Sequence, residues 1–200
     1  AKTASMQSDK LIVAAMIDPV YTTILVFSKK ASELVNTMVV QISAALMPSL
    51  AHLVGEEDYT KLRKHMVGSI KLTFILGLFG AGAIFLLNKS FVSLWVGYGF
   101  FAGTLFTILI TVYGLLYVLN VAFYNNLFAN DKILIVSKAS MFESLIRIPL
   151  SIAFCYFGGI NGIILAAILA TLPTSFLIQT RHFLKLINFS WLQSLKSLLR

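Results

Sequence analysis

The chain has 200 residues, of which 58% are hydrophobic and 12% are charged, and its mean hydropathy is +0.86. A soluble chain carries about 25% charged residues, and so few polar side chains could not cover the exterior of a soluble protein of this size. The composition argues against a soluble enzyme, a secreted disulfide scaffold and a disordered chain. Cys155 is the single cysteine, so an intramolecular disulfide is excluded. We therefore expect an all-α, polytopic membrane protein.

The apolar segments predict five spanning helices and the end of a sixth. Residues 11–17 are too few to span, and Asp18-Pro19 ends any helix there. Because the chain also begins with Ala1 rather than Met, we expect a fragment or a processed chain. Crossing the hydrocarbon takes about 20 mostly apolar residues. The segments that qualify are residues 21–54, 66–87, 101–128, 137–157 and 158–178.

The connections between these segments are alternately rich and poor in basic residues. The richer connections and the C-terminal segment hold Lys61, Arg63, Lys64, Lys132, Lys138, Arg181, Lys185, Lys196 and Arg200. The connection over residues 88–100 holds only Lys89, and the turn at Gly158-Gly159 has no charge. The positive-inside rule then predicts that the basic connections and the C-terminus are cytoplasmic. The net charge of +8 follows from this topology and needs no nucleic-acid partner.

Two regions follow from this organisation, a transmembrane bundle over residues 1–182 and a tail over residues 183–200. The tail mixes apolar residues with Lys185, Lys196 and Arg200. One interpretation is an amphipathic helix at the cytoplasmic interface. The other is a linker into a further helix.

Polar residues within the first full span are the most informative feature, because polar groups in hydrocarbon are costly. At 100° per residue, those between positions 29 and 43 share half of the helix surface. They are Lys29, Lys30, Ser32, Glu33, Asn36, Thr37, Gln41 and Ser43. The spacing of Lys29 and Glu33 predicts a pair that leaves Lys30 uncompensated. We favour a water-filled cavity lined by cationic and amide groups; alternatively, the lysines extend to the headgroups and the other residues pack.

Two later spans carry weaker polar stripes. Ser140, Glu143, Ser144, Arg147 and Ser151 recur at helical spacing, and Glu143 and Arg147 are placed to form a pair. A neutralised pair of this kind is often structural, although a binding role stays open.

Another stripe contains Tyr113, Tyr117, Asn120 and Tyr124. Its aromatic and amide groups would suit sugar rings, but ordinary packing is the preferred interpretation.

Motifs of enzymatic chemistry are absent from the sequence. It contains no phosphate-binding glycine loop with lysine, no HExxH, no GxSxG and no Cys/His cluster. We therefore expect no enzyme activity, no metal site and no cofactor. Transport, if present, would use a gradient or the downhill consumption of the substrate.

Several short motifs occur in a defined order between about residues 6 and 178. They are Met6-Gln-Ser-Asp9 with Leu11-Ile-Val13; Ala45-Leu-Met-Pro48-Ser-Leu-Ala51, followed by Gly55-Glu-Glu-Asp58 and Leu62-Arg-Lys64; Phe91-Val-Ser-Leu-Trp-Val-Gly97; and Phe157-Gly-Gly-Ile-Asn-Gly162. In order and spacing they resemble the polysaccharide flippases of the multidrug/oligosaccharidyl-lipid/polysaccharide exporter superfamily.

The resemblance implies a fold of two six-helix bundles around a central cavity, of which this chain is one incomplete half, by preference the second. It implies a bacterial inner-membrane protein that moves undecaprenyl-diphosphate oligosaccharides between leaflets, with Lys29, Lys30 and Arg147 facing the anionic headgroup. The implied partners are the lipid-linked oligosaccharide, membrane lipids, and either the missing helices or a second copy. Half of a flippase is too short to enclose a pathway alone.

Three other functions stay open. A cation-coupled multidrug exporter of the same superfamily would need a lone buried carboxylate, whereas Glu33 and Glu143 each have a basic neighbour in sequence. A membrane-embedded glycosyl- or acyltransferase would need acidic or histidine side chains at a donor site. A non-transporting scaffold in a polysaccharide-assembly complex would need only partner surfaces.

Overall fold

The computed structural model describes residues 2–187, with side chains from Ser8 onward. In this part of the chain every regular element is helical. The elements are α1 (Lys2–Met16), α2 (Pro19–Ala45), α3 (Met47–Gly55), α4 (Tyr59–Trp95), the 3-10 turn η1 (Tyr98–Phe100), α5 (Thr104–Ala129), α6 (Ile133–Thr171), the π-helical turn η2 (Leu172–Phe176) and α7 (Leu177–Leu186).

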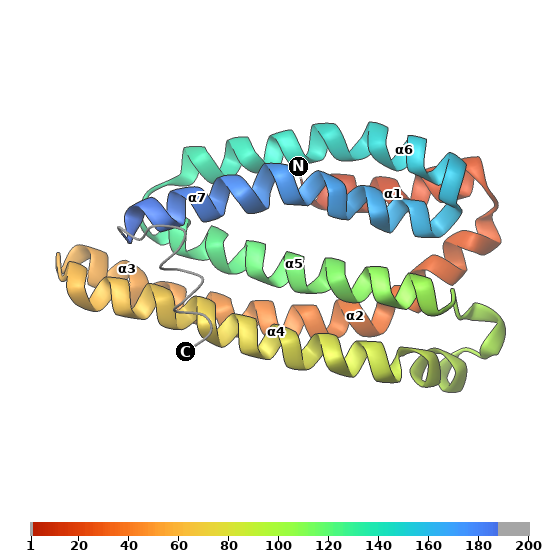
Figure 1. Ribbon diagram of the computed structural model, residues 1–200, viewed down its shortest axis with the longest axis horizontal. Helices are drawn as coiled ribbons and strands as arrows, with labels where there is room; N and C mark the ends of the chain where they lie inside the picture. The colour runs from red at the N-terminus through yellow and green to blue at the C-terminus, as the bar shows by residue number, and fades with distance from the viewer. Residues whose placement is uncertain (1, 188–200) are drawn as a thin grey trace.

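The helices lie along one axis in a bundle with α5 at its centre (Figure 1). Helix α5 packs against α2 and α4 on one side and against α6 and α7 on the other. Helix α1 packs against α6 and α2 and has only 15 residues, about 22 Å of helix. The prediction of an all-α membrane bundle is therefore confirmed.

Helix α6 is two antiparallel helices joined by a tight reversal at Gly159. The backbone there has φ 56° and ψ −136°, a conformation open essentially to glycine alone. A Cβ atom added to Gly162 would lie 1.9 Å from the carbonyl oxygen of Phe154, eight residues earlier. Such contact is impossible in a continuous helix, where eight residues rise about 12 Å. The predicted turn at Gly158-Gly159 between two spans is thus confirmed.

Local signals explain where the other helices begin. Asp18 caps α2 by accepting the Val20 N–H at 2.7 Å, and Pro19 occupies the first helical position. Asp58 caps α4 by accepting the Lys61 N–H at 3.0 Å. The Lys61 side chain lies 2.9 Å from the same carboxylate, and its hydrogen bond holds the pKa of Asp58 below the ordinary value.

Four helical stretches in the described residues are long and apolar enough to cross a membrane. They are Pro19–Gly55, Tyr59–Trp95, Thr104–Ala129 and Ile133–Leu186. The chain is a multi-pass membrane protein. The last stretch contains the Gly159 reversal, and the first one changes from α2 to α3 beside Pro48, which has no N–H to donate.

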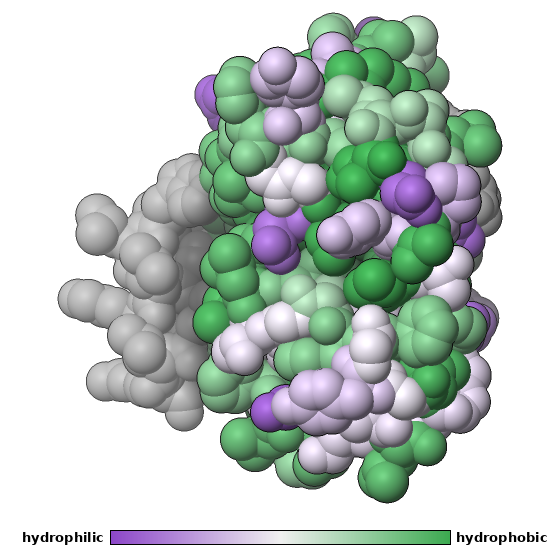
Figure 2. Space-filling view, turned by 90° about the vertical axis from the view of Figure 1, so that its right-hand side faces the viewer, coloured by the Kyte–Doolittle hydropathy of each residue, from purple (hydrophilic) through white to green (hydrophobic). Residues whose placement is uncertain are grey.

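The structure gathers the basic connections at one end of the bundle, which we call the basic end. The connections α3–α4 and α5–α6 and the end of α7 all lie there, on the left of Figure 1. Figure 2 views the opposite end, whose surface is mostly hydrophobic with a few separate hydrophilic side chains. The predicted alternation of charge therefore corresponds to two distinct ends of the molecule.

Two apolar clusters form the core. One lies at the opposite end and includes Val13, Leu25, Phe106 and Ile163; the other lies at the basic end and includes Leu53, Met66, Phe123 and Phe183. The tail predicted to begin at residue 183 starts within α7, and Phe183 and Leu184 are buried in the second cluster. Residues 188–200, which contain most of that predicted tail, lie outside the described residues.

Candidate functional site

A set of buried polar side chains lies between the two apolar clusters, and we call it the polar seam. It comes from α1, α5, both halves of α6, η2 and α7. Its members are Asp9, Tyr113, Asn120, Glu143, Arg147, Ser151, Thr171, Ser175 and Gln179, and all are at most 7% exposed. Along α5, the first cluster reaches Tyr113 and the second begins at Ala122, so the seam lies near the middle of the bundle.

The strongest interaction in the seam joins α1 to α6. An Arg147 guanidinium nitrogen lies 2.6 Å from the Asp9 carboxylate, and both side chains are 1% exposed. Arg147 also donates to the Tyr113 hydroxyl of α5 at 2.9 Å, while Ser151 donates to the second Asp9 oxygen at 3.4 Å. A charge buried in hydrocarbon is tolerated only when it is paired and hydrogen-bonded. This network therefore holds three helices together at one level.

Glu143 lies one helical turn before Arg147 and has different partners. Its carboxylate accepts hydrogen bonds from Thr171, at 2.9 Å, and from Ser175. These hydroxyls belong to the end of α6 and to η2, where Pro173 has no N–H for the helical ladder and the helix widens into a π turn. Arg147, the predicted partner of Glu143, forms an ion pair with Asp9 of α1, which the packing of α1 places against it.

Two amides in the seam lack hydrogen-bond partners in the structure. Asn120 and Gln179 are both fully buried, and neither amide oxygen nor amide nitrogen of either residue is hydrogen-bonded. Gln179 follows Thr171 and Ser175 at helical spacing, which places it on the face that contacts Glu143. Asn120 follows Tyr113 and Tyr117 along α5. Buried polar groups are normally satisfied, so these amides mark a place where water or a solute would find partners.

Tyr117 belongs to the predicted stripe, but its side chain is not fully exposed. Its ring lies 6.3 Å from that of Tyr113, and its side chain is half-buried. Tyr113 and Asn120 of the predicted stripe are buried in the bundle interior, Tyr117 lies beside the seam, and Tyr124 is 37% exposed.

The polar half of α2 divides into two environments. Ser28, Ser32 and Ser43 are buried against the bundle, whereas Glu33, Thr37 and Gln41 are exposed. The ion pair of Glu33 is with Lys30, at 4.0 Å. The ion pair predicted between Glu33 and Lys29 is thus found with Lys30, and on Lys29 the charge of Glu33 acts without an ion pair in the described residues.

Lys29 turns instead towards the interior. It is partly buried, and the charges of Asp9, Glu33 and Arg147 all act on it. Asn36 donates to Ser32 at 3.2 Å and packs on Gly114 of α5, where an added Cβ would lie 2.8 Å from its amide nitrogen. Of the candidates on α2, then, Lys30, Glu33 and Gln41 are surface groups, and Lys29 and Asn36 lie at the edge of the bundle.

Several seam residues were not among the sequence candidates. Asp9, Thr171, Ser175 and Gln179 are separated from Arg147 or Glu143 by tens of residues, so no local pattern links them. The i, i+4, i+8 spacing of Thr171, Ser175 and Gln179 in an apolar run was the available signal.

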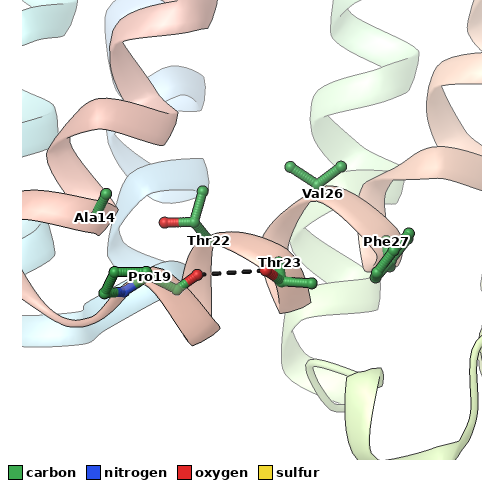
Figure 3. Close-up of a pocket in the computed structure, with 6 residues that line it drawn as sticks. All are labelled: Ala14, Pro19, Thr22, Thr23, Val26 and Phe27. Atoms are coloured by element: carbon green, nitrogen blue, oxygen red, sulfur yellow. Dashed lines mark hydrogen bonds between the residues drawn. The ribbon is translucent and has the colours of Figure 1, made fainter.

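The cavity in Figure 3 has a different character. It has a volume of about 280 Å³ and lies between Ala14 of α1 and the first turns of α2. Its lining is mainly carbon, and the Thr23 hydroxyl donates a hydrogen bond to the Pro19 carbonyl oxygen at 3.4 Å. This cavity is mainly apolar, with the buried Thr22 hydroxyl as its one unpaired polar group among the lining residues.

No group of three His, Cys, Asp or Glu side chains within residues 2–187 could hold a metal ion. Comparisons with protein-family models, with curated proteins and with solved structures gave no match. The arrangement itself offers a buried ion pair, a buried carboxylate held by hydroxyls, and an exposed polar stripe on a spanning helix.

Proposed function

We propose that the chain is part of a bacterial inner-membrane flippase that moves undecaprenyl-diphosphate oligosaccharides to the outer leaflet for polysaccharide or O-antigen synthesis. The main support is the exposed polar stripe on α2, formed by Lys30, Glu33, Thr37 and Gln41. Such groups are costly against lipid tails. A water-filled cavity bordered by α2 would explain their exposure, and the sequence motifs described above favour the same family.

The cavity needs a second wall. Only 17% of the most apolar part of the α2–α3 stretch is buried, against 44% for α5, so α2 has an unpartnered side within this chain. In the proposed transporter, further helices or a second copy face α2, and the two bodies rock about the cavity. Lys30 on the stripe attracts the diphosphate, and Lys29 at the edge of the bundle adds its positive charge, while the polyprenyl tail stays in lipid. The basic end, with the C-terminus, faces the cytoplasm.

The test replaces both lysines in the strain that carries the gene. Lys29→Gln with Lys30→Gln is expected to lower surface polysaccharide to about a tenth or less, since each positive charge near a phosphate contributes about 1 kcal/mol, or about fivefold. Lys89→Gln at the opposite end is the control and should export normally. Protein levels are compared by immunoblot. Normal export by the double variant would exclude the cavity role, and partner binding that persists in it would favour the scaffold.

A cation-coupled multidrug exporter is the second candidate, and one observation favours it. The Glu143 carboxylate is buried and accepts hydrogen bonds from the hydroxyls of Thr171 and Ser175. A buried carboxylate beside hydroxyls suits a small coupling cation. Dye efflux from cells that express the full protein distinguishes the two: efflux that depends on Glu143 with unchanged polysaccharide would replace the flippase proposal.

A further inference from the structure

A second cavity opens at the basic end, between the first turn of α6 and the last turns of α7. Its volume is about 160 Å³, and its lining residues are Lys132, Ile135, His182, Lys185 and Leu186. The positive charges of Lys185, Arg181 and Lys132 all act on His182. Basic side chains from two helices thus surround one small space, which we call the basic pocket.

The charge of the basic pocket is not balanced by the described residues. Ion pairs elsewhere at this end join Lys61 to Asp58 and His52 to Glu56. Within residues 2–187, Lys132, Arg181 and Lys185 have no such acidic partner, and Asp131 does not pair with the adjacent Lys132. A concave site with one sign of charge attracts ions of the opposite sign.

The residues around the basic pocket indicate what kind of molecule carries the bound anion. Ile135 and Leu186 form apolar parts of the lining, and the neighbouring Leu134 and Ile133 are 75% and 44% exposed. Lysine side chains next to apolar lining residues and exposed apolar surface are typical of protein segments at the boundary between lipid headgroups and acyl chains.

We propose that the basic pocket binds the phosphate of a lipid headgroup. The ammonium groups of Lys132 and Lys185 contact the phosphate oxygens, and the acyl chains lie against the exposed apolar surface of α6. This site is separate from the α2 stripe and does not depend on the flippase proposal. The same phosphate chemistry is shared by a free diphosphate, so the test includes both sources.

The test measures lipid retention on the full chain by native mass spectrometry in neutral detergent. Phosphatidylglycerol and phosphatidylcholine are titrated separately. Lys132→Gln with Lys185→Gln is expected to weaken phosphatidylglycerol binding roughly 10- to 30-fold, from the contribution of two lysines near a phosphate. The matched control, Lys64→Gln with Lys138→Gln, removes the same charge from exposed positions outside the lining and should change binding by less than about twofold.

Inorganic pyrophosphate is the second probe. Weak pyrophosphate binding beside strong phosphatidylglycerol binding supports the lipid headgroup as the source. Pyrophosphate binding that equals that of phosphatidylglycerol, and depends on Lys132 and Lys185, overturns the lipid assignment in favour of a free phosphate. Equal losses in the two double variants would overturn the site itself, because the attraction would then belong to the whole basic end. Unchanged phosphatidylglycerol binding in both double variants would also overturn the proposed site.

Discussion

At the scale of single residues, the buried pair of Asp9 and Arg147 is the most consequential contact. Each side chain is 1% exposed, so neither charge can be solvated if its partner is removed. Tyr113 and Ser151 complete the hydrogen bonds around the pair, but the Nε of Arg147 remains unpaired. The network therefore stabilises the contact between α1 and α6 only while both charges are present.

Asp9→Asn is expected to lower the free energy of unfolding by about 3 to 5 kcal/mol, the usual cost of leaving one buried charge uncompensated. Reversible unfolding in mixed micelles measures this change. Asp131→Asn, an exposed acid without an ion pair among the described residues, is the control. Adding Arg147→Gln to Asp9→Asn should cost less than the sum of the two changes, because the pair is lost only once. Strict additivity would show that the two charges do not stabilise each other.

At the scale of elements, the reversal at Gly159 determines the topology of the last third of the chain. Without it, Ile133–Leu186 would be a single helix far longer than the bilayer is thick. The close approach of Gly162 to the backbone of Phe154 allows the two halves to pack directly. That packing brings Thr171 and Ser175 to Glu143. A local backbone requirement thus creates part of the polar seam.

Gly162→Ala is expected to destabilise the protein by roughly 1 to 3 kcal/mol or more, because the added methyl group would displace backbone rather than a flexible side chain. Gly158→Ala is the matched control, since an added Cβ there has no heavy atom within 4 Å. Thermal unfolding in detergent, followed by size-exclusion chromatography, compares the two variants. Equal stability of both would mean that the reversal is looser than described.

At the scale of the whole molecule, the two ends of the bundle differ in charge. The start of α4, the start of α6 and the end of α7 meet at the basic end, whereas the end of α4 lies at the opposite end. The first three segments hold Lys61, Arg63, Lys64, Lys132, Arg181 and Lys185, and the end of α4 holds Lys89. A spanning bundle with this asymmetry is oriented by its basic end. The orientation decides which leaflet faces the basic pocket and from which side the α2 stripe is reached.

Cysteine labelling tests the orientation. In a Cys155→Ala background, Tyr98→Cys should react with a membrane-impermeant maleimide on intact cells, since Tyr98 is exposed at the opposite end. Lys64→Cys should react only after the membrane is opened. The reverse pattern would place the basic pocket in the outer leaflet and contradict the cytoplasmic assignment.

The sequence by itself determined the class of the protein, its spans and the alternation of charge between them. Composition and apolar run length act locally, so residues 66–87 and 101–128 predict α4 and α5 without knowledge of any contact. The same holds for Asp18-Pro19 and Gly158-Gly159, whose backbone preferences end or reverse a helix wherever they occur.

Only the tertiary structure decided which polar side chains meet. Helical spacing predicted the pairs Lys29–Glu33 and Glu143–Arg147, yet Glu33 pairs with Lys30, and Arg147 pairs with Asp9 from a helix 138 residues away. An ion pair between residues four apart on an exposed helix surface stabilises the helix by only a few tenths of a kcal/mol. Inside a bundle, the cost of burying a charge is several times larger, so packing between helices selects the partner.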